Sequence, residues 1–345
     1  MTTRTEHKTD ATHPQPRTDV TAHQRVLDCL GQAKIDTLPP VSEWLRSLPT
    51  PEAVAALVGA RYGLNVRSCV LLRSLANEVY QISTDEAQYV LKLYRHGGWS
   101  ADEVAWEQDL VVHVINCGVA CPPPVPLLDG RLCGELAAPE GTRPFALAEY
   151  VSGTKPQPPA SEALYQDFGR LIGRFHEAGA SFRTSHPRRA FDLNHLLDEP
   201  LRAITPYLAG HADKVTALAD QARQQLSTRE LSWGVQHGDV TLDNVHRTDR
   251  GLVLHDFDLA GPGWLAADLA GVHATRHWPA FAAGYAAVRT LPEMSALPWL
   301  EVCALLSNLR FHMIEKPLYR GLESLTEGWV DRELARIDEL ARQLC

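Results

Sequence analysis

One stretch near the middle of the chain combines side chains that could carry out chemistry: SWGVQHGDVTLDNVHRTDRGLVLHDFDLAGPGWLAADLAG. It contains Asp239, Asn244, Asp256 and Asp268, some of them next to apolar runs such as LVLH that are typical of a buried strand. Burying a carboxylate costs free energy unless a cation or a hydrogen-bond network stabilises it. The stretch therefore predicts a functional site.

The chemistry that fits these side chains is phosphoryl transfer from a nucleotide. Its loose transition state requires the protein to position the reactants and to neutralise phosphate charge. Mg²⁺ prefers carboxylate and amide oxygens and keeps several waters, so one Asp with one Asn or Asp can hold it. A lysine for the phosphates is present in the run AQYVLKLYR, where strand alternation places Lys92 on a face with apolar neighbours. A carboxylate with an ordinary pKa near ~4 would orient the acceptor hydroxyl and take its proton late.

The elements that must position these residues begin with two short helices and a sheet. The apolar spacing in VSEWLRSL and PEAVAALVGARYGL predicts the helices, with Pro51 in a first turn and Gly63 as a stop. The runs VRSCVLLR, EVYQIS and AQYVLKLYR are typical of an antiparallel meander. A helix capped by Ser100 and a buried strand over RPFALAEYVSG follow them.

The rest of the chain is predicted to be mostly helical. A proline-rich segment forms an extended connector, and SEALYQDFGRLIGRFHEAG shows one apolar stripe at helical spacing. We expect a disordered tail over residues 1–24, a nucleotide-binding lobe over 25–148, and a hinge with a helical catalytic and acceptor lobe over 149–345. Further helices are expected at about 213–226, 268–288, 298–314 and 330–344, and two short strands in the acidic stretch.

The composition limits the partners of this site. The net charge of −9 and the absence of a block of Lys and Arg argue against nucleic acid and favour a cationic or neutral small molecule. No stretch approaches the ~18 apolar residues of a membrane span, and the N-terminal residues have no apolar signal region. The seven cysteines include no C-x-x-C pair, which is typical of reduced thiols in the cytoplasm. The sequence carries no marker of oligomeric state.

The acidic stretch also resembles a known family. HGDVTLDN fits the pattern H-x-D-x-x-x-x-N with His237, Asp239 and Asn244, and an apolar strand leads into Asp256-Phe257. This order resembles the aminoglycoside phosphotransferase and choline kinase-like family, a group of small-molecule kinases with the bilobal α+β fold of protein kinases. The resemblance runs from about residue 71 to about residue 309 and includes YVLKLYR, LAEYVSG, LIGRFH and FAAGYAAVR.

The resemblance implies a role for each matching residue. Asp239 would be the catalytic carboxylate, and Asn244 and Asp256 would bind Mg²⁺. Lys92 would contact the α and β phosphates of ATP or GTP, and Glu107 would pair with Lys92 from its helix.

Supporting roles are implied for residues around this centre. His237 and Asp268 would brace the catalytic loop, and the backbone from Glu149 to Val151 would receive the adenine. The loop that should cover the phosphates, RSLANEVY, has no glycine for close backbone approach, so Ser74 and Asn77 are assigned polar contacts there.

Some assignments leave alternatives. Asp258 is either a further metal carboxylate or a loop cap, and Glu103 shares a helical face with Glu107. His246 and His255 lie beside acidic residues, which would suit zinc, but one flanks a loop and the other lies inside a strand.

The predicted function is transfer of the γ-phosphate of ATP or GTP to a hydroxyl of an antibiotic, an amino sugar or an amino-alcohol metabolite. A Ser/Thr protein kinase is the first alternative, although only a short link separates Phe257 from Asp268. A metallophosphoesterase would need further metal motifs that the sequence lacks. A nucleotide-binding pseudokinase is favoured only by the glycine-free loop.

Overall fold

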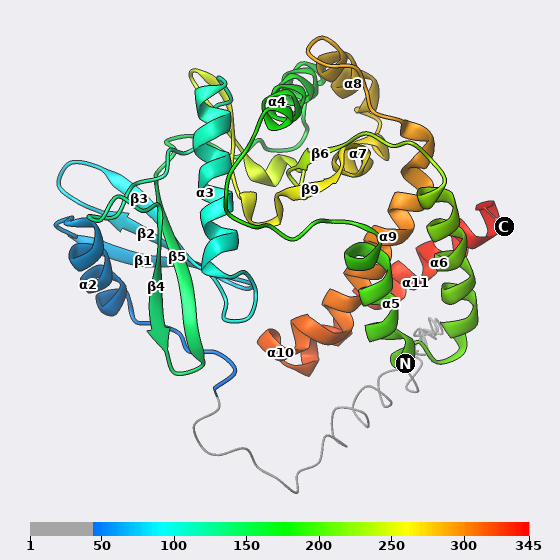
Figure 1. The fold of residues 1–345 in the computed structure, drawn as a ribbon, viewed down its shortest axis with the longest axis horizontal. Helices are drawn as coiled ribbons and strands as arrows, with labels where there is room; N and C mark the ends of the chain where they lie inside the picture. Colours follow the sequence, from blue (N-terminus) through cyan, green and yellow to red (C-terminus); the bar gives the residue numbers. More distant parts are fainter. Residues whose placement is uncertain (1–43, 345) are drawn as a thin grey trace, which may run out of the picture.

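The computed structural model of the protein describes residues 44–344, so the predicted tail of residues 1–24 lies outside them. The first part of the described chain forms a five-stranded antiparallel sheet with strand order β1-β2-β3-β5-β4 (Figure 1). Its strands are β1 (Ser68–Ser74), β2 (Glu78–Ser83), β3 (Gln88–Leu93), β4 (Cys133–Ala138) and β5 (Gly141–Glu149). Lys92 therefore lies on the central strand, opposite Val79 of β2 and Ala146 of β5.

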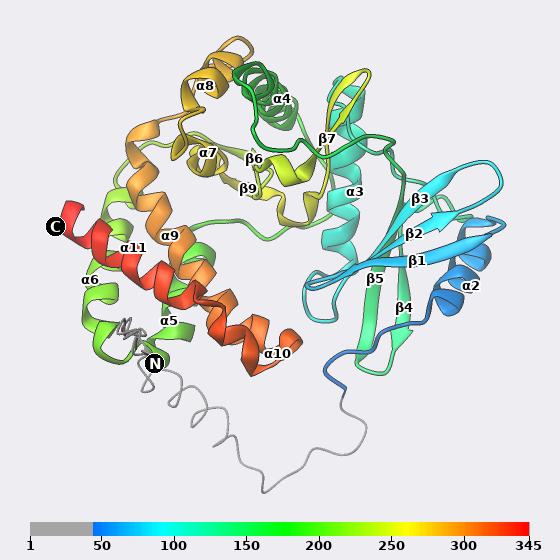
Figure 2. The same cartoon turned by 180° about the vertical axis from the view of Figure 1, so that it is seen from behind.

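Two helices cover this sheet. Helix α2 (Pro51–Tyr62) packs on the face that carries Leu91 and Leu93, in one buried apolar cluster. Helix α3 (Ala101–Asn116) begins at Ser100, whose hydroxyl accepts from the Glu103 N–H in a capping box. It lies between the sheet and the later helices in both views (Figures 1 and 2). We call α2, β1 to β5 and α3 the sheet lobe.

The chain from α4 onward, which we call the helical lobe, is built around two apolar clusters. Helix α4 (Glu162–Ala180) shares an apolar cluster with α3 through Phe168 and Phe175. The predicted stripe of this helix is buried except at Leu164, which is half-buried. The other α-helices are α5 (Glu199–Ile204), α6 (Ala212–Ser227), α7 (Leu265–His273), α8 (Trp278–Ala286), α9 (Leu297–Arg310), α10 (Lys316–Arg320) and α11 (Trp329–Leu344). None of the helices within residues 44–344 is long and apolar enough to cross a membrane.

The acidic stretch forms two small antiparallel sheets, four strands where two were predicted. Strand β6 (Trp233–Gln236) pairs with β9 (Gly261–Trp264), and β7 (Val245–Thr248) pairs with β8 (Gly251–Leu254). Short 3₁₀ turns at Leu242–Asn244 and Phe257–Leu259 connect them. The pairing of β7 with β8 brings the end of the first turn beside the start of the second, which assembles the site.

The helix predicted over VSEWLRSL is wrong for its described residues, because 44–50 are not helical. The residue before a proline disfavours helix, and Pro49 follows Leu48. Backbone groups of Ser47 bond instead to distant residues: its N–H donates to Glu140, and its carbonyl accepts from Arg143.

The helix predicted over 268–288 is two helices. Helix α7 ends at His273, and α8 starts at Trp278 with Pro279 in its first turn, where a proline is tolerated. In the interior of one long helix Pro279 would remove a hydrogen bond and clash with the preceding turn. Strand β4 was not predicted, since its sequence CGELAA is poor in β-branched and aromatic residues and its pairing with β5 decides its conformation.

Candidate active site

Lys92 and two aspartates form the centre of the site. The Nζ of Lys92 lies 2.5 Å from Asp256 Oδ1 and 3.7 Å from Asp258 Oδ2. Burial opposes the charged ammonium, but the two carboxylates outweigh that effect and raise the pKa of Lys92 above its ordinary value. Lys92 holds the pKa of Asp256 well below its ordinary value, while burial raises the pKa of Asp258 to about 7. The pair therefore carries one firmly ionised carboxylate and one that titrates near neutrality.

Asp256 has an unusual backbone. Its φ of 69° and ψ of 63° lie in the left-handed region, which is uncommon for a residue other than glycine. This conformation turns the chain away from the direction of strand β8, and the 3₁₀ turn of residues 257–259 follows directly. Strained backbone of this kind is concentrated at functional sites.

Asn244 and Asp239 form the second part of the site. The Nδ2 of Asn244 donates to Asp239 Oδ2 at 2.7 Å and to the Asp239 carbonyl at 3.0 Å. The Asn244 carbonyl accepts from the His255 N–H at 3.0 Å, next to Asp256 in the chain. Asn244 is buried, whereas Asp239 is exposed. The arrangement therefore presents the Asp239 carboxylate to solvent and leaves the amide oxygen of Asn244 free to accept.

Asp268 holds the loop that carries Asp239. Its carboxylate accepts from the backbone N–H of His237 at 2.6 Å and of Gly238 at 2.7 Å. The Nε2 of buried His176 lies 2.9 Å from Asp268 Oδ2, and its Nδ1 lies 2.9 Å from the Tyr285 hydroxyl. The His237 ring also contacts the His255 carbonyl at 3.1 Å. His176 is thus a second brace of the loop, a role that no pattern in the sequence indicated.

Gly238 is required where the loop that carries Asp239 passes residues 256–259, which we call the aspartate turn. Its φ is +82°, and a Cβ placed there would lie 2.2 Å from the Leu259 carbonyl oxygen. Glycine alone allows this close approach in this conformation.

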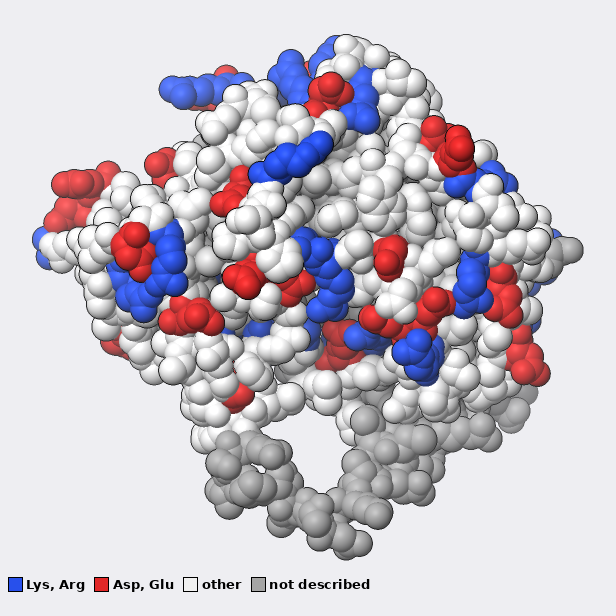
Figure 3. All heavy atoms as spheres, viewed as in Figure 1, with Lys and Arg blue, Asp and Glu red and all other residues white. Residues whose placement is uncertain are grey.

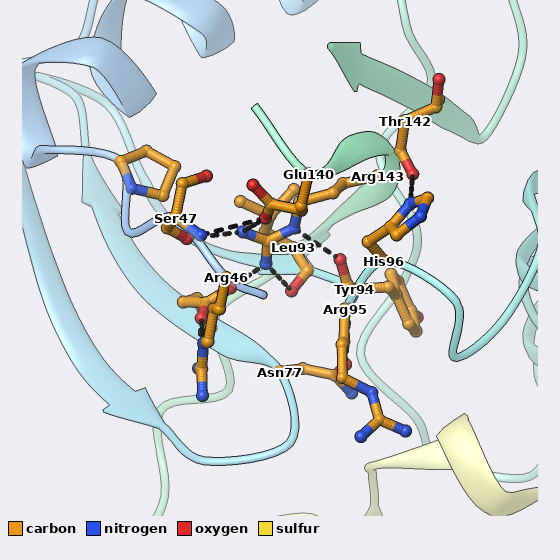
Figure 4. Close-up of polar contacts among 12 residues, drawn as sticks. Arg46, Ser47, Asn77, Leu93, Tyr94, Arg95, His96, Glu140, Thr142 and Arg143 are labelled. Atoms are coloured by element: carbon orange, nitrogen blue, oxygen red, sulfur yellow. Dashed lines mark hydrogen bonds and ion pairs between the residues drawn. The ribbon is translucent and has the colours of Figure 1, made fainter. Parts of the chain in front are cut away.

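The glycine-free loop between β1 and β2 is held by polar contacts. The hydroxyl of Ser74 accepts from Arg46 Nη2 at 2.7 Å, so it is engaged inside the sheet lobe. The Nδ2 of Asn77 donates to Asp258 Oδ2 at 2.8 Å. Its Oδ1 accepts from the Arg95 N–H at 3.1 Å (Figure 4). Asn77 therefore ties the loop to the aspartate turn.

The predicted ion pair of Lys92 with Glu107 is not formed in this structure. Glu107 is buried and its Oε1 accepts from the Tyr94 hydroxyl at 2.7 Å, while its Oε2 is buried without a hydrogen-bond partner. Lys92 contacts Asp256 instead because that carboxylate lies within ion-pair distance. The alternative residue, Glu103, caps its own helix.

The segment predicted to receive adenine follows β5. The Tyr150 N–H donates to the carbonyl of Gln88 on β3. The neighbouring Glu149 N–H points to the opposite side of the strand and donates to the Pro123 carbonyl. Backbone groups alternate along an extended strand, so the Glu149 carbonyl also faces away from β3. Val151 continues the chain beyond the strand.

Arg188 is a site residue that the sequence analysis missed. Its guanidinium donates to the carbonyls of Asp258 at 2.5 Å, Ala260 at 2.8 Å and Glu103 at 3.1 Å. It also stacks 3.7 Å from the ring of Trp99. This one side chain therefore fixes the aspartate turn to the first turn of α3, and no local pattern in the sequence indicated it.

The rings of His246 and His255, the two histidines considered for zinc, contact each other in a tilted arrangement, with ring centroids 4.6 Å apart. Burial lowers the pKa of His246, and it lowers the pKa of His255 to about 3, so both rings are neutral near pH 7. Within residues 44–344 no group of three or more His, Cys, Asp and Glu is arranged to hold a metal ion. The amide oxygen of Asn244 and the carboxylates of Asp256 and Asp258 are oxygen donors of the kind that Mg²⁺ prefers.

Known proteins are similar to this chain over the part that contains these residues. The model of the phosphotransferase enzyme family matches residues 69–300. An uncharacterized protein of Deinococcus radiodurans is 40% identical over 233 residues, which cover 66% of this chain and 67% of that protein. The homoserine kinase of Sinorhizobium medicae is 30% identical over 264 residues, which cover 70% of this chain and 76% of that enzyme.

Solved structures show the same fold. The amicoumacin kinase hAmiN, in complex with AMP-PNP, Ca²⁺ and Ami, has a TM-score of 0.68 at 19% identity and covers 86% of this chain and 94% of its own. A microcompartment-associated aminopropanol kinase has a TM-score of 0.65 at 22% identity, with coverage of 84% and 94%. The antiparallel sheet followed by helices is thus the kinase-like fold that the resemblance predicted. The chain belongs to the phosphotransferase enzyme family and is an enzyme of the small-molecule kinase class.

Proposed function

We propose that this enzyme transfers the γ-phosphate of ATP or GTP, bound with Mg²⁺, to a hydroxyl of a small molecule that also carries an amine. The observation that carries the proposal is the convergence of Lys92, Asp256 and the Asn244–Asp239 pair from separate segments of the chain. These are the groups that phosphoryl transfer requires, namely a cation for phosphate, metal ligands and a carboxylate for the acceptor.

Asp239 would act on the acceptor. Its carboxylate is exposed, and one oxygen is fixed by Asn244 at 2.7 Å. The other oxygen would accept a hydrogen bond from the acceptor hydroxyl and take its proton late in the transfer. Asp268, which anchors the two preceding N–H groups, would keep this carboxylate in place.

Asp256, Asn244 and Asp258 are the proposed metal ligands, and bound Mg²⁺ would neutralise phosphate charge. Lys92 would contact the α and β phosphates. A metal ion on Asp256 would compete with Lys92 for this carboxylate. The unpartnered Oε2 of buried Glu107 is a second acceptor to which the ammonium group would turn. The backbone at Glu149 and Val151 would receive the base.

The acceptor class follows from two observations. Homoserine and aminopropanol, which the relatives' names specify, each carry a hydroxyl and an amine. The net charge of −9 favours cationic ligands. On the face in Figure 3, acidic and basic side chains are interspersed, without the continuous basic area that nucleic acid would require. We place the reaction in the cytoplasm, where thiols stay reduced. Within residues 44–344 the cysteines are free, namely Cys69, Cys117, Cys121, Cys133 and Cys303.

A panel assay tests the function. The protein is incubated with Mg²⁺ and ATP or GTP and with homoserine, aminopropanol, choline, amino sugars, aminoglycosides, macrolides or Ser/Thr peptides, and products are identified by mass spectrometry. We expect one added phosphate on an amino alcohol with the wild-type protein and a large loss with Asp239→Asn. Phosphate on peptides alone would contradict the proposal, and so would nucleotide binding without any product.

A further inference from the structure

Arg73 enters the site through an irregularity of strand β1. The pairing of β1 with β2 shifts between Leu71, which lies opposite Tyr80, and Arg73, which lies opposite Val79. Such a bulge adds one residue to a strand and redirects the side chains that follow it. Here the Nη2 of Arg73 lies 3.0 Å from Asp256 Oδ2, across the interface between the two lobes.

Arg73 and Lys92 approach the same carboxylate from two strands. Lys92 contacts Asp256 Oδ1 at 2.5 Å, and Arg73 contacts Oδ2 at 3.0 Å. The Lys92 side chain is 16% exposed, whereas that of Arg73 is 55% exposed and stays open to a ligand. An anion bound by Lys92 in front of Asp256 would therefore lie within reach of the Arg73 guanidinium.

The other polar side chains of this loop are already engaged. Arg46 holds the Ser74 hydroxyl and, through Nη1, the Leu75 carbonyl at 2.8 Å. Asn77 is bonded at both ends of its amide. Its Nδ2 donates to Asp258, and its Oδ1 accepts from the Arg95 backbone N–H (Figure 4). Of the residues 73–77, Arg73 alone carries a charge.

A second set of contacts keeps the base of the loop rigid. The buried carboxylate of Glu78, which follows the loop, is bonded to both Arg46 and Arg143. Arg143 also donates to the Tyr94 carbonyl at 3.0 Å (Figure 4). The loop is thus held from inside the sheet lobe, and Arg73 is its one charged side chain that extends toward the aspartates.

We propose that Arg73 is a phosphate-binding residue. Its guanidinium would make the phosphate contacts that the backbone of a glycine-rich loop makes in other kinases. The proposal rests on the proposed function, since it concerns the nucleotide of that reaction. Without glycine, the backbone of RSLANE stays farther from the phosphates. A guanidinium on a long side chain reaches across that distance, and its planar donors match phosphate oxygens.

The competing explanation is that Arg73 only forms an ion pair with Asp256. Exposed ion pairs contribute little to stability, so this explanation predicts small effects on folding and none that depends on phosphate. The two explanations therefore differ in nucleotide affinity.

Arg67 is a matched control for the test. It precedes the same strand, its side chain is 59% exposed, and it pairs with Asp85 at 2.6 Å, outside the site. Arg67→Met and Arg73→Met remove the same charge from equally exposed positions. Lys92→Met reports on the proposed function itself.

The experiment measures Kd for ADP and for AMP-PNP with Mg²⁺ by titration calorimetry, for the wild type and the three variants. We expect Arg73→Met to weaken ADP binding about tenfold and AMP-PNP binding more, since each charge-assisted contact is worth about that factor. Arg67→Met should match the wild type, and Arg73→Lys should recover part of the loss. The Mg²⁺ concentration for half-maximal ADP binding should not change in Arg73→Met.

Equal affinities for Arg73→Met and Arg67→Met, with weaker binding by Lys92→Met, would overturn the role of Arg73 and leave the proposed function standing. A change confined to the Mg²⁺ dependence would also overturn it, because Arg73 would then act only through Asp256. Unchanged nucleotide binding by Lys92→Met would contradict the proposed function instead.

Discussion

Lys92 Nζ and Asp256 Oδ1 lie 2.5 Å apart although 164 residues separate them in the chain. The contact joins the central strand of the sheet lobe to the turn after β8 in the helical lobe. It pairs two charges that are largely withdrawn from water, where an uncompensated charge would be costly. The ion pair therefore couples the arrangement of the two lobes to the electrostatics of the site.

Asp256→Ala should remove the metal-dependent part of nucleotide binding. Mg²⁺ with AMP-PNP should raise the melting temperature of the wild type, since a ligand that binds only the folded state stabilises it. In the variant, adding Mg²⁺ to the AMP-PNP sample should give no further rise. Asp249→Ala, on the exposed turn between β7 and β8, is the control. The same Mg²⁺ increment in Asp256→Ala and in the control would exclude the metal role.

Asp239→Asn should reduce turnover by about 10²-fold or more while Kd for the nucleotide stays within about twofold, because this carboxylate acts on the acceptor. Steady-state kinetics and calorimetry measure the two quantities. Asp243→Asn changes an aspartate of the same loop and should keep wild-type turnover. Near-normal turnover of Asp239→Asn would make Asp239 a structural residue.

Asp258 should make the stability of the ligand-free protein fall as pH rises from about 4 to 7. Burial raises its pKa from 3.8 to about 7, so in this window the folded state binds more protons than the unfolded state. Asp258→Asn cannot ionise, so its melting temperature relative to the wild type should be higher at pH 8 than at pH 5. Melting curves in EDTA at both pH values test this expectation. A pH-independent difference would show that Asp258 has an ordinary pKa.

Arg188→Met should lower the free energy of unfolding by about 2 kcal/mol or more, because three carbonyls lose a charged donor. Urea unfolding measures this change, with Arg250→Met on an exposed turn as the control. The apparent affinity for Mg²⁺ should also fall, since Arg188 positions the turn that carries Asp258. A loss of stability with unchanged Mg²⁺ affinity would limit Arg188 to a structural role.

Gly238→Ala should greatly reduce turnover. The added Cβ would clash with the Leu259 carbonyl, so the loop before Asp239 would have to move. Gly271→Ala is the control, because a Cβ there meets nothing within 4 Å. Circular dichroism separates a local shift from unfolding, and full activity of folded Gly238→Ala would contradict the predicted clash.

The sequence by itself determined the parts of this protein that depend on local pattern. Strand alternation around Lys92, the cap at Ser100 and the apolar stripe of α4 predicted their elements, because each pattern spans only a few turns or residues. The spacing of Asp239, Asn244 and Asp256 indicated the family for the same reason. The residue roles implied by that resemblance stay predictions until the variants are measured, and so does the lobe boundary at residue 149.

Only the tertiary structure decided which charges meet. Arg73 reaches Asp256 through a strand bulge, Arg188 reaches three carbonyls from a connecting segment, and Glu107 bonds to Tyr94 in place of Lys92. Over residues 44–50 the prediction of a helix before Pro51 failed, because long-range contacts to Arg46 and Ser47 override local propensity. Such contacts join residues far apart in the chain, and their free energy depends on distance and burial, which no local pattern of residue types contains.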